Sequence, residues 1–371
     1  MDRDIHYLKM AARLALRGHG GAEPNPMVGC VIVSPRGETV GWGYHHQCGG
    51  PHAEVVALRR AGERARGATL YCTLEPCDHT GRTPPCTKAI IDAGLARVVI
   101  ARRDPNPIAA CGVARLDRAG IRTQIIDQCE AAIAVSDPFA HRIRTGLPWV
   151  IAKWAQTIDG KIATRPPHHD SKWISNQASR AMVHRERGRV DAILTGIGTV
   201  LKDDPLLTAR DVRVRRIARR IVIDPRLEMP AHAKLAATAH AVPTIIICAE
   251  AALAHRAEHL LQLKQCGVEV IGAPMQGDCL PMKPILADLV KRFDLTSVLV
   301  EAGTGLLSEL FRQKLANEAW VFIAPTILGD EQARTAVAGV EVARITDSAR
   351  LQLLSLRHRQ GDIIARYRVR I

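Results

Sequence analysis

The sequence predicts two α/β domains in a single chain, on the basis of three observations. The chain has 371 residues, 47% of them hydrophobic, which is enough for more than one buried core. Short apolar runs bounded by glycine and proline alternate with amphipathic runs of helical length, the pattern of a sheet covered by helices. The basic stretch 141–149, with its glycine and proline, interrupts this series. It is the expected boundary between a domain over 1–146 and a domain over 147–371.

The first domain is expected to begin with a helix and then to alternate strand and helix. The opening helix places Ile5, Leu8 and Ala12 at helical spacing. After a loop, residues 27–33 predict an apolar strand and 37–45 its hairpin partner, with glycines at the turns. The remaining expected elements are a helix at 53–65, a strand at 68–74, a helix at 87–94, a strand at 97–101, a helix at 112–120 and a strand at 121–127.

The second domain shows a similar alternation. A strand that runs into Gly303-Thr304-Gly305 and then an amphipathic helix offers free backbone N–H groups for a phosphate, although a glycine turn without a ligand has the same pattern. The stretch 194–201 has Leu201 where the third glycine of a dinucleotide fingerprint would stand, so it is not a Rossmann motif. The expected strands are 149–156, 191–196, 219–224, 244–248, 268–272, 297–303, 318–325 and 363–371.

Composition excludes some classes of protein and leaves others open. No apolar run approaches the roughly 18–20 residues that cross a bilayer, and the acidic, amphipathic N-terminus is unlike a signal peptide, so a cytoplasmic protein is expected. The formal net charge of +14, concentrated in the arginine-rich run 209–220, suits either nucleic acid or a small phosphorylated substrate. Aromatic residues are 4% of the chain and form no stacking clusters, which argues against nucleic acid.

The strongest chemical signal is a histidine and two cysteines that can share one metal ion. His52 opens a predicted helix, and Cys77 and Cys86 bound a proline- and glycine-rich loop after a predicted strand. One imidazole and two thiolates leave the fourth tetrahedral position of Zn²⁺ open, as in catalytic zinc sites. Zinc lowers the pKa of a bound water to about 7, and Glu54 is placed to transfer protons. This order of residues is the signature of zinc nucleobase deaminases.

The order of His52, Glu54, Cys77 and Cys86 along the chain is more specific for a zinc site than any single motif within it. His-x-Glu and Pro-Cys each occur by chance, and this wide cysteine spacing is a weaker metal signal than Cys-x-x-Cys. The His-His-Asp stretch 168–170 is expected to be a solvated loop, because three adjacent side chains cannot face one ion in regular structure. The other cysteines have no such partners and are expected to be small buried residues: Cys30, Cys48, Cys72, Cys111, Cys129, Cys248, Cys266 and Cys279.

Four stretches of the first half, 24–33, 43–58, 73–86 and 101–107, resemble the deaminase half of the bacterial riboflavin-biosynthesis bifunctional deaminase/reductase family, the RibD/RibG type. Gly-Arg-Thr-Pro-Pro between the two cysteines separates this family from cytidine and tRNA-adenosine deaminases. The resemblance implies a cytidine-deaminase-like αβα sandwich. It also implies hydrolytic deamination of 2,5-diamino-6-ribosylamino-4(3H)-pyrimidinone 5′-phosphate. The implied substrate contacts are Asn25, His45, His79 and Arg82, although Asn25 could instead set a turn and Arg82 could face solvent.

The second half resembles the reductase half of the same family over 152–163, 171–175, 191–210 and 300–307. The resemblance implies a dihydrofolate-reductase-like α/β domain. This domain would use NADPH to reduce the ribosyl group of 5-amino-6-(5-phosphoribosylamino)uracil to ribityl, by hydride transfer to C1′. The implied cofactor contacts are Ala155, Trp173, Thr199, Asp203, Gly303, Thr304, Gly305 and Leu306. The implied substrate contacts are Ser171, Arg187, Leu207, Arg210 and Glu301, with both arginines on the phosphate.

Three positions depart from the family pattern or match no part of it. Pro225 stands where relatives often carry a serine that touches the cofactor. The loop between Asp159 and Trp173 is longer than usual. Arg216 lies in the arginine-rich run, matches no family position and is expected to be solvated.

The expected function is a bifunctional enzyme of riboflavin synthesis with Zn²⁺ and NADPH as cofactors. Its expected partner is a small phosphorylated pyrimidine, with no nucleic acid and no membrane, and the resemblance implies a homo-oligomer, a dimer or a tetramer. Two alternatives remain open from the sequence alone. The protein could be a zinc deaminase of nucleic acid with a basic binding module, or the second half could be a non-catalytic oligomerisation domain.

Overall fold

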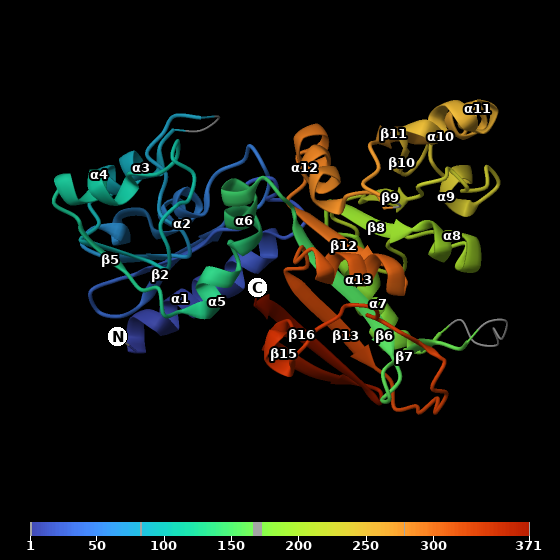
Figure 1. Cartoon of the computed structure of the whole chain (residues 1–371). Coiled ribbons are helices and arrows are strands. Elements are labelled where there is room, and N and C mark those ends of the chain that lie inside the picture. Colours follow the sequence, from blue (N-terminus) through green and yellow to red (C-terminus); the bar gives the residue numbers. More distant parts are fainter. Residues whose placement is uncertain (1, 82–83, 166–172, 278, 371) are drawn as a thin grey trace. The chain divides into compact units, whose positions relative to one another are not determined.

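The computed structural model describes residues 2–81, 84–165, 173–277 and 279–370 (Figure 1). The chain divides into two compact units, Met1–Leu147 and Pro148–Ile371, and the division falls inside the stretch 141–149. Arg82, Ser171 and the His-His-Asp stretch lie outside the described residues.

The first unit is built on a five-stranded sheet. Its strands are β1 (Gly29–Val33), β2 (Thr39–Tyr44), β3 (Thr69–Cys72), β4 (Arg97–Ile100) and β5 (Arg122–Ile125). They lie in the order β2-β1-β3-β4-β5. β1 is antiparallel to β2 and β3, whereas β3, β4 and β5 run parallel. The hairpin and every later strand predicted for this half are present.

Helices cover both faces of this sheet. They are α1 (Asp2–Ala15), α2 (Ala53–Ala61), α3 (Cys86–Asp92), α4 (Gly112–Arg118), α5 (Glu130–Ala134) and α6 (Asp137–Thr145), with short 3₁₀ turns η1 (Leu16–Gly18) and η2 (Gly62–Ala65). Ile32 and Leu70 pack with buried residues of α2, α3 and α4 on one face. Val31 and Tyr71 pack with α1 and α5 on the other. Because neighbouring strand residues point to opposite faces, this confirms the predicted αβα sandwich.

The close approach of α2 to β2 explains two glycines in the strand. A Cβ atom at Gly41 would lie 2.3 Å from the carbonyl oxygen of Ala57, and one at Gly43 would lie 2.3 Å from that of Ala53. Only glycine leaves room for a helix backbone at this distance. The contact fixes the first turn of α2, where His52 and Glu54 lie.

The second unit contains a nine-stranded sheet and a small two-stranded one. Its strands are β6 (Trp149–Gln156), β7 (Lys161–Ala163), β8 (Ala192–Gly196), β9 (Arg219–Ile223), β10 (Thr244–Ala249), β11 (Glu269–Ala273), β12 (Ser297–Glu301), β13 (Glu318–Ile323), β14 (Arg334–Thr335), β15 (Arg350–Arg359) and β16 (Asp362–Arg370). The large sheet has the order β11-β10-β9-β8-β12-β6-β13-β16-β15, and β14 pairs with β7. Each strand predicted for this half is present, whereas β7, β14 and β15 were not predicted.

The large sheet is mostly parallel. The seven strands from β11 to β13 pair in parallel, and β16 and β15 complete the sheet in antiparallel pairs. The connecting helices are α7 (Gln177–Arg187), α8 (Ile197–Asp203), α9 (Lys234–Ala237), α10 (Glu250–His255), α11 (Ala257–Gln265), α12 (Met282–Phe293) and α13 (Thr304–Arg312), with a 3₁₀ turn η3 (Ile345–Asp347). None of the described helices is long and apolar enough to pass through a lipid bilayer.

Two of the cysteines expected to be buried are exposed. Cys111 lies directly before α4 with a left-handed φ of 82°, and Cys279 lies in the loop before α12, so the prediction was wrong for both. Cys48 and Cys266 are half-buried. The burial prediction is confirmed for Cys30, Cys72, Cys129 and Cys248.

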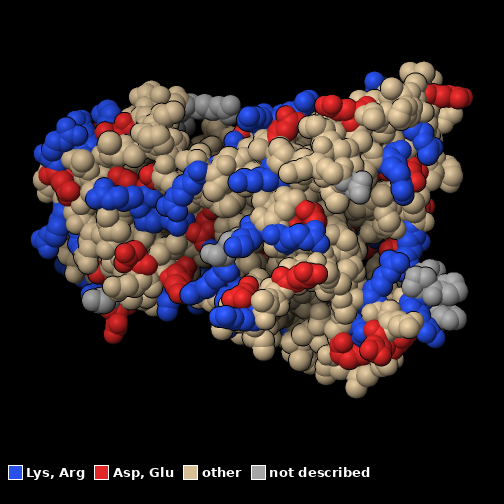
Figure 2. Space-filling view, viewed as in Figure 1, with Lys and Arg blue, Asp and Glu red and all other residues tan. Residues whose placement is uncertain are grey.

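The positive charge is dispersed over the surface. Figure 2 shows Lys and Arg side chains over the visible face of both units, interrupted by Asp and Glu. The expectation that Arg216 is solvated is wrong, because its guanidinium forms an ion pair with the buried carboxylate of Asp191. The same carboxylate accepts hydrogen bonds from the backbone N–H groups of Thr296 and Ser297, each at 2.9 Å. Part of the arginine-rich run is therefore structural.

Candidate active sites

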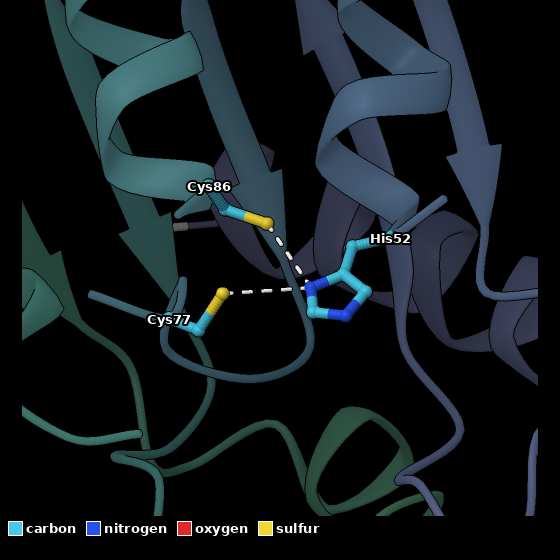
Figure 3. A group of neighbouring side chains, drawn as sticks. All are labelled: His52, Cys77 and Cys86. Atoms are coloured by element: carbon cyan, nitrogen blue, oxygen red, sulfur yellow. Dashed lines mark hydrogen bonds between the residues drawn. The ribbon is translucent and has the colours of Figure 1, made fainter. Parts of the chain in front are cut away.

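The first unit brings His52, Cys77 and Cys86 together at the ends of three different segments. His52 is the residue before α2, Cys86 is the first residue of α3, and Cys77 lies in the loop that follows β3. His52 Nδ1 is 3.2 Å from Cys86 Sγ and 3.5 Å from Cys77 Sγ. Figure 3 shows the three side chains pointing toward a common centre, and their ligand atoms all lie within 4.8 Å of one another.

Backbone contacts hold Cys77 in this position. The buried carboxylate of Glu75 accepts hydrogen bonds from the N–H of Val113 at 2.8 Å and from the N–H of Asp104 at 3.0 Å. A Cβ atom at Gly112 would lie 1.8 Å from the carbonyl oxygen of Pro76, so the start of α4 touches the cysteine loop directly. The loop is thereby fixed at Glu75 and Pro76, directly before Cys77.

The chemistry of the three donors fits zinc. Hydrogen bonds from Cys86 and His52 lower the pKa of the Cys77 thiol to about 4, while the adjacent sulfur of Cys77 raises the pKa of the Cys86 thiol. The hydrogen bond with Cys77 also raises the pKa of His52. A thiolate is the form of cysteine that binds a metal, and one imidazole with two sulfur donors is a ligand set of catalytic zinc sites.

Glu54 lies beside this group in the first turn of α2. Its side chain is 4% exposed, and burial raises the pKa of its carboxyl group to about 7. A carboxyl group that titrates near neutral pH can both accept and donate a proton. The position and protonation of Glu54 therefore suit a general acid–base next to a metal.

The structure also gathers two of the predicted substrate residues near His52. Asn25 Nδ2 lies 3.2 Å from His45 Nε2, and His45 Nδ1 donates to the carbonyl oxygen of Pro51 at 3.1 Å. The His45 ring meets the His52 ring edge to face, with centroids 5.3 Å apart. Burial lowers the pKa of His45, so that a neutral ring is favoured. Asn25 and His45 are therefore positioned by the fold beside His52, one of the three candidate metal ligands.

His79 is a third predicted substrate residue that the structure describes. Its Nδ1 atom is buried and has no hydrogen-bond partner within the described residues. An unpartnered buried nitrogen costs free energy unless a ligand or water completes it, which suits a substrate contact.

Sequence reasoning missed two acids next to these residues, the buried Glu23 and the half-buried Asp104. Glu23 accepts hydrogen bonds from the N–H of Gly20 at 2.9 Å and contacts His19 Nδ1 at 2.8 Å, which shapes the turn that carries Asn25. Burial raises the pKa of Asp104 to about 6, and its carboxylate accepts from the N–H of Asn106 at 2.8 Å. Both acids lie next to glycines or prolines in loops, which is the sequence signal that could have identified them.

In the second unit, Glu301, at the end of β12, forms a bidentate ion pair with Arg187. Arg187 Nε donates to Glu301 Oε1 at 2.6 Å, and Arg187 Nη2 donates to Glu301 Oε2 at 2.9 Å. Lys153 Nζ lies 3.5 Å from the same carboxylate. The two cations hold the pKa of Glu301 at about 2 despite its burial. Lys153, on β6, was not predicted as a site residue.

The segment from Leu207 to Arg210 packs beside this ion pair. The carbonyl oxygen of Thr208 accepts from Arg187 Nη1 at 3.2 Å and from His184 Nδ1 at 3.0 Å. Arg210 Nη1 donates to the Thr208 hydroxyl at 3.3 Å. Partial burial and the charge of Arg187 lower the pKa of Arg210. Two guanidinium groups thus lie close enough to repel, an arrangement that a phosphate would stabilise.

The predicted cofactor residues fall into two groups. Gly196, at the end of β8, approaches Leu306 at the start of α13, since a Cβ atom on the glycine would lie 3.9 Å from Leu306. The turn before Thr199 is therefore next to the 303–306 turn, and a Cβ at Gly303 or Gly305 would meet nothing within 4 Å.

The other predicted cofactor residues are less closely tied to that turn. Trp173 is 55% exposed and stacks on Arg180, whose Cζ is 4.8 Å from the ring centroid. Ala155 lies on β6 and Asp203 ends α8. Pro225, two residues after the end of β9, has no side-chain hydroxyl, and its carbonyl oxygen accepts a hydrogen bond from the N–H of Ala249 at 3.0 Å.

Both halves match known protein families. Residues 1–102 match the cytidine and deoxycytidylate deaminase zinc-binding region, and residues 148–365 match the RibD C-terminal domain. The chain is 43% identical to the riboflavin biosynthesis protein RibD of Aquifex aeolicus over 88% of each protein. It is 37% identical to RibD of Escherichia coli over 97% of this chain and 98% of that protein.

Solved structures show the same similarity over the whole chain. A structure of Acinetobacter baumannii RibD matches with a TM-score of 0.83 and 35% identity, covering 100% of this chain and 99% of that one. A structure from Thermotoga maritima matches with a TM-score of 0.82 and 31% identity over 99% of both chains. That protein is described as a diaminohydroxyphosphoribosylaminopyrimidine deaminase/5-amino-6-(5-phosphoribosylamino)uracil reductase. The nucleic-acid alternative is not favoured, because both similarities extend through the second half.

Proposed function

This chain belongs to the RibD family of bifunctional riboflavin-biosynthesis enzymes, and we propose how its residues divide the work between the two activities. It is a diaminohydroxyphosphoribosylaminopyrimidine deaminase and a 5-amino-6-(5-phosphoribosylamino)uracil reductase. The first reaction exchanges an amino group for oxygen, and the second reduces the sugar. The observation that supports the first most strongly is the convergence of His52, Cys77 and Cys86 beside buried Glu54.

In the deaminase half, His52, Cys77 and Cys86 would hold Zn²⁺, and Glu54 moves the protons. Zinc bound there would supply an activated water at neutral pH. Glu54 takes a proton from the attacking water and delivers one to the departing amino nitrogen, which leaves as ammonia. A carboxyl group whose pKa is about 7 matches both tasks.

The substrate of this half is held by side chains around the metal ligands. Asn25 and His45 bind polar edges of the pyrimidine, and the unpartnered Nδ1 of His79 completes a hydrogen bond with the substrate. Arg82, outside the described residues, binds the phosphate in the same proposal, since a guanidinium makes paired hydrogen bonds to phosphate oxygens.

In the reductase half, NADPH supplies the hydride and Arg187 and Arg210 bind the substrate phosphate. Ala155, Trp173, Thr199, Asp203 and the turn 303–306 contact the cofactor, and the open space around Gly303 and Gly305 allows its phosphates to approach the backbone. The hydride would form a C1′–H bond as the C1′–O4′ bond breaks, and the released ring oxygen would take a proton from solvent, which gives the open ribityl chain. Ser171, Leu207 and Glu301 complete the substrate contacts.

A homo-oligomer and a cytoplasmic location are part of the proposal. β15 is the edge strand of the large sheet, and it exposes apolar side chains that a second copy would cover. These are Leu351, Leu353, Leu354 and Leu356, between 40% and 60% exposed. Light scattering of Leu353→Lys should report a smaller assembly than wild type. Reduced Cys77 and Cys86 are required as ligands, which a reducing cytoplasm maintains.

The proposed function is tested by incubating the purified protein with the phosphoribosyl diaminopyrimidinone and following ammonia release and NADPH loss separately. We expect ammonia release without NADPH, and NADPH consumption once deaminated product has formed. Ammonia release without any later NADPH loss would refute the reductase assignment. NADH used as well as NADPH would refute the choice of cofactor.

A further inference from the structure

Arg220 has the largest fully buried side chain in the described part of the chain. It lies on β9, and its side chain is 0% exposed. Its hydrogen-bond partners among the described residues are threonine hydroxyls and backbone carbonyl oxygens, with no carboxylate. Burial without a counter-charge lowers its pKa to about 10. A buried cation is costly unless its N–H groups are satisfied, so its retention calls for an explanation.

The guanidinium of Arg220 links two segments. Nη2 and Nε face the region between α9 and β10, where they donate to Leu235 O at 3.0 Å, to Val242 O at 3.0 Å and to Thr244 Oγ1 at 2.6 and 3.0 Å. Nη1 divides its hydrogen bonds between Thr238 Oγ1 at 2.7 Å and Leu206 O at 3.1 Å. The contact with Leu206 thus ties a second segment to this buried centre.

That second segment has an unfavourable backbone. Leu207 adopts a left-handed φ of 49° and is buried, and Asp204 also has a positive φ, of 39°. Such conformations in residues other than glycine persist only when surrounding contacts impose them. Arg220 holds the carbonyl oxygen before Leu207, while Arg187 and His184 hold the carbonyl oxygen after it, on Thr208. Leu207 is therefore fixed from both sides.

We propose that Arg220 is a positioning residue of the reductase, which holds the Leu206 carbonyl so that Leu207 and Arg210 meet the phosphoribosyl substrate. The proposal rests on the proposed substrate contacts of Leu207 and Arg210. It requires a guanidinium, because the planar group reaches Leu206 and the α9–β10 region at once. Lysine presents three donors from a single nitrogen and cannot span both.

The test compares Arg220→Lys with Thr238→Val in the full-length protein. Thr238→Val removes the other acceptor of Nη1 and leaves Leu206 in place, so it reports the structural part of the role. Arg220→Lys should raise the KM of the reductase for its pyrimidine substrate by about tenfold or more, since a hydrogen bond to a charged group is lost. It should leave the Kd for NADPH and the deaminase activity unchanged. Thr238→Val should leave the KM unchanged.

Hydrogen exchange gives a second readout that does not depend on activity. The peptide 203–212 should exchange faster in Arg220→Lys and in Arg220→Gln than in wild type, while peptides from β8 should not change. Three results in Arg220→Lys and Arg220→Gln would each overturn the proposal: an unchanged KM, unchanged exchange over 203–212, or loss of NADPH binding. Arg220 would then stabilise the fold without positioning the substrate contacts. A wild-type protein that does not oxidise NADPH would refute the proposed function, whereas the exchange measurement would still test the link to Leu206.

Discussion

The two halves of this molecule bury charge in opposite ways. In the deaminase half, Glu54, Cys77 and Cys86 gather around His52, and their interactions drive the pKa values of the two thiols apart. In the reductase half, Glu301 lies between Arg187 and Lys153, which hold its pKa at about 2. The first cluster is rich in acidic groups, and the second supplies its own cations.

This difference implies different requirements for stability and function. An acid-rich group of sulfur and imidazole donors is completed by a cation, so metal binding contributes to the stability of the segments that carry it. A carboxylate already paired with a guanidinium and an ammonium needs no added ion, but it suffers when one partner is removed. The deaminase half should therefore respond to metal, and the reductase half to the loss of one of its charges.

The largest expected effect is loss of the metal. Cys86→Ser should eliminate bound zinc and deamination, because a hydroxyl does not replace the thiolate among three ligands. Elemental analysis of the wild type should show one zinc per chain. Cys111→Ser, an exposed cysteine close to the same loop, is the control and should retain the metal. Zinc retained in Cys86→Ser would remove Cys86 from the site.

The next effect separates the two activities. Glu54→Gln keeps the shape of the side chain and removes its acid–base function, so deamination should fall by roughly 10²–10⁴-fold. Reduction of pre-deaminated substrate should stay the same, since the residues proposed for the reductase all lie in the other unit. Glu63→Gln, exposed in the turn after α2, serves as the control. A parallel fall of both activities in a folded protein would contradict independent sites.

The reductase half should be most sensitive at Glu301. Glu301→Gln leaves Arg187 and Lys153 without their carboxylate, which should cost roughly 3–5 kcal/mol of unfolding free energy. It should also lower the reductase kcat/KM by more than about a hundredfold, because two charge-assisted hydrogen bonds are weakened. Denaturant titration and steady-state kinetics measure both quantities. Asp288→Asn, which breaks an exposed ion pair with Arg292, should change stability by only about 0–1 kcal/mol.

The same substitution has a pH dependence of known sign. The folded pKa of Glu301, about 2, lies below its ordinary value of 4.5. Its contribution to stability is therefore fully present above pH 4.5 and is lost as the pH falls toward 2. The stability difference between wild type and Glu301→Gln should shrink over that interval. A difference that grows toward low pH would contradict the ion-pair assignment.

The smallest expected effect concerns the phosphate. Arg210→Ala should lower the reductase kcat/KM by about tenfold to a hundredfold, which corresponds to a charge-assisted hydrogen bond worth roughly 1.5–3 kcal/mol. Deamination should not change. Arg213→Ala is the matched control, since Arg213 is exposed in the same run. Arg216 is unsuitable because it pairs with buried Asp191. Equal effects of Arg210→Ala and Arg213→Ala would mean that the run acts only through its summed charge.

The metal group of the deaminase half could be predicted from the sequence because its residues lie in short, recognisable motifs. His52 and Glu54 share one helical turn, and the cysteines bound one loop, so a short motif carries the metal group. Strand β1 is buried throughout and β4 is buried after its first residue, which makes both visible as apolar runs. The role of Glu75 was missed because it depends on backbone N–H groups of distant segments, which no sequence pattern reports.

The reductase half could be predicted only in part. Its buried parallel strands were visible, but β15 mixes charged, polar and apolar residues, all of them exposed or half-buried, so no burial signal marks it. Lys153 and Arg220 look like ordinary basic residues in their strands, and only the sheet brings them to Glu301 and Leu206. Arg216 was expected to be solvated because its partner, Asp191, comes from a different strand region.

One measurement tests most directly the claim that the halves are independent and that only one needs a metal. Protein dialysed against a chelator is given pre-deaminated substrate and NADPH, and in parallel the diaminopyrimidinone substrate. The account predicts unchanged NADPH oxidation with the first substrate and no ammonia release with the second, restored by added Zn²⁺. Loss of NADPH oxidation together with ammonia release, both restored by zinc, would contradict it.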